Sequence, residues 1–359
     1  MIDSPRPKIG AGASAALDAL RLAAALVVVV FHASSQWTTA YPATHAALGK
    51  ASHAAVVLFF VISGYVIAFT TAGSPRSARQ YAVARLSRLY AVLVPALLLT
   101  AAVEYLVVRT DAGLAGRYVH EYSEIRYLLT ALFCNEIGFF SAAPPLNSPL
   151  WSLSYEFWYY VLFGIWHYGR GRRGAWLWLA AAGLVAGPKV LLLLPIWLMG
   201  VGAYLWDKPA WVANYSWLWT GGWLILASAA VVFLPALPVA IGAKPLFMAG
   251  QFATDWLVGA LFGLAIWSLP AGSRPARPAG GRVLRLAADL SFPVYALHFP
   301  LLVLGQVVAG KRANDLAQMG VVVVGVLAAA SLLGWLCDIQ RAWWRRLFAW
   351  LLRVRSPAR

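Results

Sequence analysis

Long apolar runs alternate with short polar segments along the whole chain. The runs are about 20 residues long, the length of an α-helix that crosses the hydrocarbon core of a bilayer. We therefore predict an all-α fold, a polytopic transmembrane bundle of about ten spans. Pro188 separates the fifth from the sixth span, and the two could instead form one re-entrant unit, because proline ends or kinks a helix. The spans are placed near residues 15–34, 53–72, 89–108, 149–168, 174–188, 189–206, 216–235, 254–270, 289–309 and 318–339.

Composition agrees with a membrane location. Of the 359 residues, 61% are hydrophobic and 12% are charged, whereas a soluble domain carries about 25% charged residues. The net charge of +16 comes from short basic clusters between the apolar runs rather than from one patch. We therefore expect the lipid bilayer, and no nucleic acid, as a partner. Cys134 and Cys337 lie in no CxxC or Cys/His cluster, so no metal site is expected.

The basic clusters also indicate an orientation. With the N-terminus inside, more than twice as many Lys and Arg residues fall in the inner connections as in the outer ones. This distribution follows the positive-inside rule, so we expect both termini in the cytoplasm. We also expect the chain to lie in the plasma (inner) membrane. We divide it into a transmembrane domain, residues 1–340, and a basic cytoplasmic tail, residues 341–359. The longest outer connection, 109–148, can fold over a site.

The first span carries three ionisable residues, Asp18, Arg21 and His32. Such groups cost about 2.5–3.5 kcal/mol on insertion scales and are functional candidates by default. Arg21 and His32 lie on nearly the same face of a helix, about 16 Å apart along its axis. The span therefore presents a polar stripe that suits a reaction using both compartments. Alternatively, His32 is satisfied by a neighbouring helix, and Asp18 and Arg21 form a local i,i+3 ion pair.

Four further ionisable residues qualify. Glu156 is ringed by aromatic residues, so it is neutral or paired with another helix; Arg21 or His32 is the expected partner, in a functional site or in a structural bridge. For His298, in the ninth span, we favour a structural polar contact. Arg85 and Arg88 share one face of a helix and could clamp the phosphates of a cofactor such as coenzyme A, or simply mark the inner side.

Five segments, in order and covering nearly the whole chain, resemble the acyltransferase-3 family, which O-acylates glycans and some small molecules. Phe292 and Ala296 depart slightly from the family pattern. We expect no extracytoplasmic SGNH domain, so the membrane domain completes the transfer or passes the group to a separate protein. The segments are Leu17-Asp18-Ala19-Leu20-Arg21 with the Arg-x10-His spacing to His32, Leu58-Phe59-Phe60-Val61-Ile62-Ser63-Gly64-Tyr65, Arg85-x-x-Arg88, Leu150-Trp151-Ser152-Leu153-Ser154-Tyr155-Glu156 and Ser291-Phe292-Pro293-Val294-Tyr295-Ala296-Leu297-His298.

The resemblance implies an O-acyltransferase that moves an acyl group, most simply acetyl, from cytoplasmic acyl-CoA to a hydroxyl of a cell-surface glycan or its lipid-linked precursor. It implies His32 as general base or transient acyl carrier, and Arg21 as a group that holds the donor or the thioester oxyanion. The other implied roles are orientation of the histidine by Glu156 and Asp18, phosphate binding by Arg85 and Arg88, and substrate binding by Ser63, Tyr65, Trp151 and His298. Ser63 and Gly64 are also expected to permit close helix packing.

Other functions are alternatives. The ionisable residues within the spans could form the relay of a proton-coupled secondary transporter, although the order of the segments and the lack of paired broken helices argue against it. Acylation of a hydrophobic small molecule is a second alternative, and a non-catalytic scaffold ranks last. Acyl-CoA turnover separates an enzyme from the rest. The acceptor, the acyl chain length, covalent or direct transfer, and the oligomeric state, a homo-oligomer included, stay open.

Overall fold

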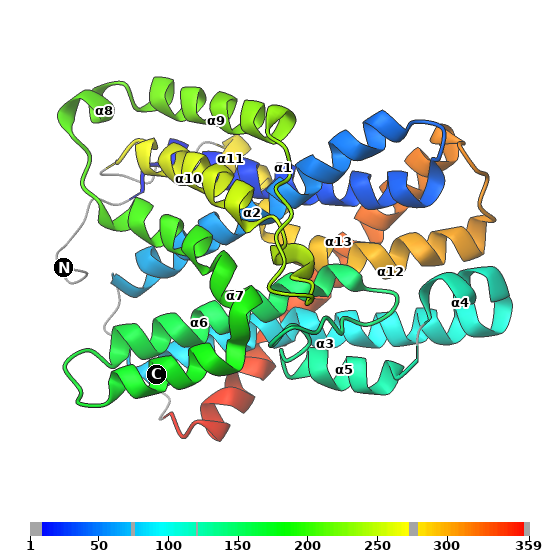
Figure 1. The fold of residues 1–359 in the computed structure, drawn as a ribbon, viewed down its shortest axis with the longest axis horizontal. Helices are drawn as coiled ribbons and strands as arrows, with labels where there is room; N and C mark the ends of the chain where they lie inside the picture. Colours follow the sequence, from blue (N-terminus) through cyan, green and yellow to red (C-terminus); the bar gives the residue numbers. More distant parts are fainter. Residues whose placement is uncertain (1–8, 73–75, 120, 273–278, 355–359) are drawn as a thin grey trace. The chain divides into compact units, whose positions relative to one another are not determined.

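The computed structural model describes residues 9–72, 76–119, 121–272 and 279–354, and these residues form helices and no strands (Figure 1). Arg6, Lys8, Arg274, Arg277, Arg355 and Arg359, which contribute to the predicted orientation, lie outside the described residues. The helices are α1 (Ala11–Trp37), α2 (Pro42–Ala72), α3 (Ala78–Thr110), α4 (Ala112–Tyr118), α5 (Ser123–Ala131), η1 (Ser148–Leu150), α6 (Trp151–Tyr168), α7 (Ala175–Leu205), α8 (Ala210–Asn214), α9 (Ser216–Phe233), η2 (Phe247–Ala249), α10 (Phe252–Ser268), α11 (Ala279–Asp289), α12 (Ser291–Ala309) and α13 (Leu316–Leu351).

Among the described residues, seven helices are long and apolar enough to cross a membrane: α1, α2, α3, α7, α9, α12 and α13. Each of the ten predicted spans coincides with a helix, with α7 covering two of them. The helix α10 is apolar but has only 17 residues. The described residues therefore confirm an all-helical fold with several helices suited to a multi-pass membrane protein, whereas the number of spans and the side of each terminus stay predictions.

Several helices extend beyond the apolar runs that predict them. The helix α3 begins at Ala78, well before the apolar run at 89–108. Ser77 and Gln80 form a capping box there: the Ser77 side chain accepts from the Gln80 amide, and the Gln80 side chain accepts from the Ser77 amide. Hydropathy shows where a helix can be buried in lipid, but the capping residues decide where it begins.

The helix α7 is interrupted where the sequence predicts a break. Gly187 has φ 82° and ψ 177°, a backbone conformation that favours glycine, and Pro188 follows it. A Cβ atom on Gly187 would lie 2.5 Å from the backbone nitrogen of Gly138, so the close approach also requires glycine. The break begins one residue before the proline used to predict it.

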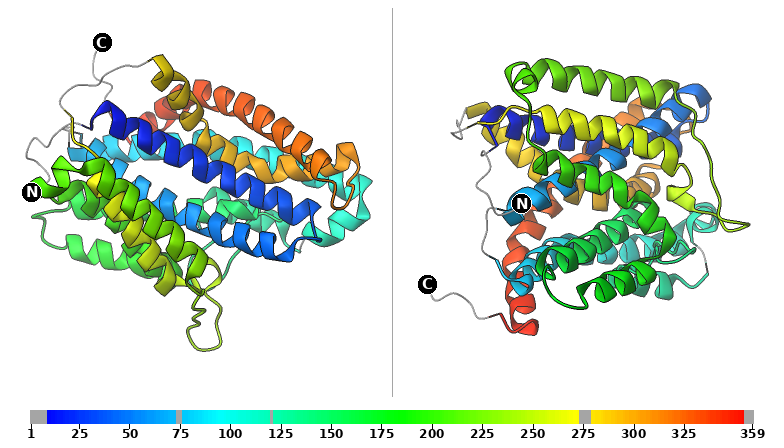
Figure 2. Two further views of the ribbon diagram at one scale, coloured as in Figure 1. Left: turned by 90° about the horizontal axis from the view of Figure 1, so that it is seen from above. Right: turned by 60° about the vertical axis from the view of Figure 1, so that its left-hand side comes forward.

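The chain divides into two compact units, each described by itself. Unit 1 comprises residues 1–31, 42–75 and 191–291, and unit 2 comprises 32–41, 76–190 and 292–359. Within unit 1, α10 packs against α9 and α2. Within unit 2, α3 packs against α13 and α6 and also contacts the short helices α4 and α5 (Figures 1 and 2).

Glycine permits a close crossing of α2 and α7 in unit 1, as expected for Gly64. A Cβ atom on Gly64 would lie 2.0 Å from the carbonyl oxygen of Trp197, and one on Gly200 would lie 1.9 Å from that of Val61. The two backbones therefore touch where both helices lack a side chain. Beside this crossing, the indole Nε1 of Trp197 donates to Ser63 Oγ at 3.2 Å.

Candidate active site

Two histidines, one from α1 and one from α12, contact each other within unit 2. Nδ1 of His32 lies 3.0 Å from Nε2 of His298. Nδ1 of His298 lies 2.7 Å from the carbonyl oxygen of Tyr295. His298 is fully buried, whereas His32 is partly exposed and packs its ring against the edge of Phe299. The predicted polar contact of His298 is therefore present, and its partner is His32.

The Tyr295 carbonyl determines which nitrogens carry protons. A carbonyl oxygen only accepts hydrogen bonds, so Nδ1 of His298 is the protonated nitrogen. A buried ring is neutral, because desolvation penalises the charge; Nε2 of His298 then holds a lone pair and accepts the Nδ1–H of His32. Neutral His32 consequently has its own lone pair on Nε2. The contact selects the tautomer in which His32 Nε2 can act as a base.

A proline explains how α12 is held beside this pair. Pro300 has no N–H, so the carbonyl of Ala296 lacks its usual donor within the helix. Nδ2 of Asn147 donates to this carbonyl at 2.9 Å and to Oγ1 of Thr100 at 3.1 Å. Asn147 is fully buried. Its hydrogen bond to the Ala296 carbonyl links the segment before α6 to α12, two residues before His298.

A second set of hydrogen bonds joins α12 to the start of α6. The hydroxyl of Tyr295 donates to the carbonyl of Pro149 at 2.9 Å, and Ser152 Oγ lies 2.8 Å from the same hydroxyl. The tyrosine has one hydrogen to give, so Ser152 is the donor in the second contact. Trp151 is buried beside these residues in sequence, with its ring edge-on to Tyr155. The fourth and fifth resembling segments are therefore in direct contact.

Glu156 extends this polar group along α6. It accepts a short hydrogen bond from the hydroxyl of Tyr160, one turn further along the helix. Its carboxylate is also close enough to the Tyr295 hydroxyl to interact with it electrostatically. Glu156 thus hydrogen-bonds to Tyr160 and lies near the Tyr295 hydroxyl, and the backbone carbonyl of Tyr295 contacts His298. The pairing of Glu156 with Arg21 or His32 stays a prediction.

The two arginines before the third apolar run lie on aromatic faces of unit 2. The guanidinium of Arg85 lies 5.7 Å from the ring centre of Tyr81 and 5.9 Å from that of Tyr160. The guanidinium of Arg88 lies 5.9 Å from the ring centre of Phe292. Although Phe292 departs from the family pattern, its aromatic ring contacts this arginine. Nε of Arg85 is buried and has no hydrogen-bond partner among the described residues. An unsatisfied guanidinium N–H favours an anionic partner.

Arg85 also borders a groove of about 300 Å³ between α3 and α6. Tyr168, at the far end of α6, lies close enough to Arg76 and Arg85 to interact with both electrostatically. One end of the groove is therefore positively charged, while its walls are mostly apolar. The lining residues are Ala78, Tyr81, Ala82, Arg85, Leu86, Leu89, Phe157, Tyr160, Val161, Gly164, Ile165 and Tyr168.

Asp18 and Arg21 lie in unit 1. Nη1 of Arg21 is 3.9 Å from Oδ1 of Asp18, which is the i,i+3 contact that the sequence offers as the alternative interpretation. Nη2 of Arg21 donates to Oγ of Ser291 at 3.3 Å. Within its own unit, each end of the polar stripe on α1 therefore contacts the last resembling segment: Arg21 its first residue and His32 its last.

The other predicted substrate residues pack α2 on α7 in unit 1. Ser63 accepts from Trp197 as described above, and the ring of Tyr65 lies edge-on to Tyr204, with 5.9 Å between ring centres. These contacts account for both residues through helix packing. Their part in substrate binding stays a prediction, as does that of Trp151.

The sequence analysis does not identify two contacts of ionisable residues: a buried ion pair in unit 2 and a contact between a histidine and a carboxylate in unit 1. In unit 2, Nζ of Lys189 lies 2.7 Å from Oε2 of Glu136, and both side chains are fully buried. Burial raises the pKa of Glu136, even though the ammonium group of Lys189 stabilises the ionised carboxylate. In unit 1, Nε2 of His53 lies 3.0 Å from both carboxylate oxygens of Asp255. For the contact in unit 2, the sequence gives one indication, a lysine within an apolar run directly after Pro188.

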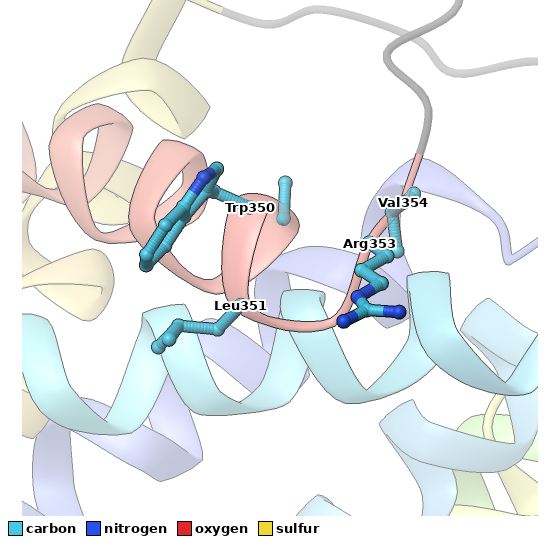
Figure 3. A pocket seen from close by; sticks show the side chains of 5 residues that line it. Trp350, Leu351, Arg353 and Val354 are labelled. Carbon is cyan, nitrogen blue, oxygen red and sulfur yellow. The ribbon is translucent and has the colours of Figure 1, made fainter.

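A larger open hollow, of about 650 Å³, lies at the end of α13 (Figure 3). Arg353 is the one ionisable residue that lines it. This lining provides neither a base nor a nucleophile, so we place the candidate active site at His32 and His298. The lining residues are Ala349, Trp350, Leu351, Arg353 and Val354.

Comparison with known proteins identifies the family. The family model described as an acyltransferase domain, acyltransferase-3, matches residues 14–337, nearly the whole chain. No curated protein and no solved structure matches the chain. The matched region contains both histidines, all the polar contacts described around them and the two arginines at the groove. The chain therefore belongs to the acyltransferase-3 family of membrane acyltransferases.

Proposed function

We propose that the protein transfers an acyl group, most simply acetyl, from cytoplasmic acyl-CoA to a hydroxyl of a cell-surface glycan or of its lipid-linked precursor. The observation that carries the proposal is the contact between His32 and His298, because it supplies a neutral imidazole whose tautomer is fixed. A general base requires such a group within a membrane bundle, where few side chains can take up a proton.

The transfer can be written as a direct displacement of CoA by the acceptor hydroxyl. Nε2 of His32 removes the proton from the acceptor hydroxyl while the hydroxyl oxygen bonds to the carbonyl carbon of the thioester. The carbon–sulfur bond then breaks, and the proton passes from His32 to the departing CoA thiolate. The products are the O-acylated acceptor and CoA, and His32 is neutral again. In the alternative order, His32 Nε2 first accepts the acyl group itself and then passes it to the hydroxyl.

His298 and Glu156 act through His32 in this scheme. When His32 becomes positively charged, its Nδ1–H remains donated to Nε2 of His298, which stabilises the charge. Glu156, whose carboxyl group lies near the hydroxyl of Tyr295, is assigned to the orientation of the histidine. Arg21, paired with Asp18, is assigned to the donor or to the oxyanion of the thioester carbonyl.

The arginines are assigned to the donor. The buried N–H of Arg85 without a partner in the described part of the chain suits a phosphate oxygen of CoA, and Arg88 lies one turn away on the same helix. The positive end of the groove beside Arg85 would receive the phosphates, and its apolar walls would contact the less polar parts of the donor. Coenzyme A enters this scheme as part of a substrate.

A proton-coupled transporter is the second candidate, favoured by the presence of Glu156, His298 and His32 in one part of unit 2. Thioester consumption separates the two functions, because a transporter leaves acyl-CoA intact.

The proposal is tested by incubating membranes that contain the wild type or the His32→Ala variant with radiolabelled acetyl-CoA. We expect labelled envelope glycans with the wild type and none with a well-expressed, correctly inserted variant. Equal labelling in both would remove His32 from the mechanism. Consumption of acetyl-CoA by neither would contradict the enzymatic function for this donor.

A further inference from the structure

Two glutamines form another polar contact between α1 and α12 within unit 2. Nε2 of Gln306 donates to Oε1 of Gln36. The side chains are almost fully buried: Gln36 is 1% exposed and Gln306 is 3% exposed. Gln36 follows His32 by one helical turn, and both residues contact α12. They therefore project from the same face of α1.

This amide pair is incomplete. Nε2 of Gln36 and Oε1 of Gln306 are buried, and neither has a hydrogen-bond partner among the described residues. Exchanging the oxygen and nitrogen of both amides reverses the bond between the glutamines but changes nothing else. Either way, one donor and one acceptor remain unsatisfied, which is costly for buried groups.

The unsatisfied groups define the chemistry of a ligand. A hydroxyl both donates and accepts, so a single hydroxyl satisfies the amide donor and the amide acceptor together. A carboxylate or a phosphate only accepts, and an ammonium only donates; each would leave one of the two glutamine groups unpaired. The two unsatisfied groups therefore match the hydrogen bonding of a neutral hydroxyl, and not that of a carboxylate, a phosphate or an ammonium.

We propose that Gln36 and Gln306 bind a hydroxyl of the acceptor next to the hydroxyl that His32 deprotonates. This inference rests on the proposed function and deepens it: the acceptor carries at least two hydroxyls, as a glycan does. The turn of helix between His32 and Gln36 spans about 6 Å, a distance that two hydroxyls of one glycan can bridge. In the predicted orientation, Gln36 lies on the outer side of His32, from which a surface glycan would arrive.

The test compares the wild type with Gln36→Met, Gln306→Met and the double variant. Methionine keeps the length of the side chain but removes its hydrogen-bonding groups. Gln318→Met is the matched control, because the Gln318 amide is already bonded to Trp37, Arg312 and Gly310. Purified proteins in lipid nanodiscs receive radiolabelled acetyl-CoA and increasing amounts of the envelope glycan fraction that wild-type membranes label. The apparent KM for each substrate and kcat are measured, with the melting temperature of each variant.

We expect the KM for the glycan fraction to rise about tenfold in each single variant, the loss of one hydrogen-bonded group, with the KM for acetyl-CoA unchanged. The double variant should show no further rise, because both substitutions remove the same hydroxyl site. An unchanged KM for the glycan, or a parallel loss in all parameters together with a lower melting temperature, would overturn the inference and leave the proposed function intact. A wild type that consumes no acetyl-CoA would overturn both.

Discussion

Replacing His298 by leucine is expected to slow acyl transfer without weakening the binding of acyl-CoA. The substitution places an apolar side chain in a fully buried position and removes the acceptor that lies 3.0 Å from Nδ1 of His32. His32 then loses both the contact that fixes its tautomer and the contact that stabilises its positive charge during transfer.

The expected loss in kcat follows from the one hydrogen bond that the substitution removes. A hydrogen bond to a charged group contributes about 1.5–3 kcal/mol, which corresponds to a loss of about 10- to 150-fold in kcat. The His298→Gln variant should retain more activity than His298→Leu, because an amide oxygen can still accept the Nδ1–H of His32. Its amide nitrogen can also donate to the Tyr295 carbonyl.

The assay is steady-state release of CoA from acetyl-CoA by purified variants in nanodiscs, in the presence of the labelled glycan fraction. His45→Leu serves as the control, since His45 stacks on Phe31 in unit 1 and has no part in the proposed reaction. Full kcat in His298→Leu would refute the assignment of His298 as a positioning residue. A rise in the KM for acetyl-CoA at constant kcat would refute it as well.

Three further perturbations follow from the packing and the charges. Gly200→Ala would bring a Cβ atom 1.9 Å from a carbonyl oxygen of α2, so we expect the loss of monodisperse protein on size-exclusion chromatography. The control Gly222→Ala should behave as the wild type, because a Cβ atom there meets no atom within 4 Å. Lys189→Met leaves the buried Glu136 without its cation and should cost about 3–5 kcal/mol, seen as a lower melting temperature; adding Glu136→Met should recover most of the loss. Arg85→Gln should raise the KM for acyl-CoA about tenfold in steady-state assays, with a smaller change in kcat.

The helices were predictable because the length of an apolar run reports directly on burial in lipid. The break in α7 was predictable for a similar reason, since Pro188 acts on the backbone locally. The start of α3 was missed because hydropathy ignores the capping residues Ser77 and Gln80. Spacing on one helix also gave the i,i+3 contact of Asp18 with Arg21.

Contacts between helices were less accessible. His32 and His298 are 266 residues apart, and Glu136 and Lys189 are 53 apart; no helical period relates such positions. Their pairing is decided by how the helices pack. A local signal did exist for Asn147, because Pro300 frees a carbonyl on α12 that some buried donor must satisfy. The identity of that donor still required the fold.

Release of free CoA from acetyl-CoA by the purified protein tests the central claim most directly. Wild type and His32→Gln, both in lipid nanodiscs and of equal thermal stability, are compared in the presence of the glycan fraction. The account predicts steady release with the wild type and at least a hundredfold slower release with the variant, about 2.7 kcal/mol in activation free energy. Equal rates would contradict the role of His32 as the base, and no release by the wild type would contradict acyl transfer from this donor.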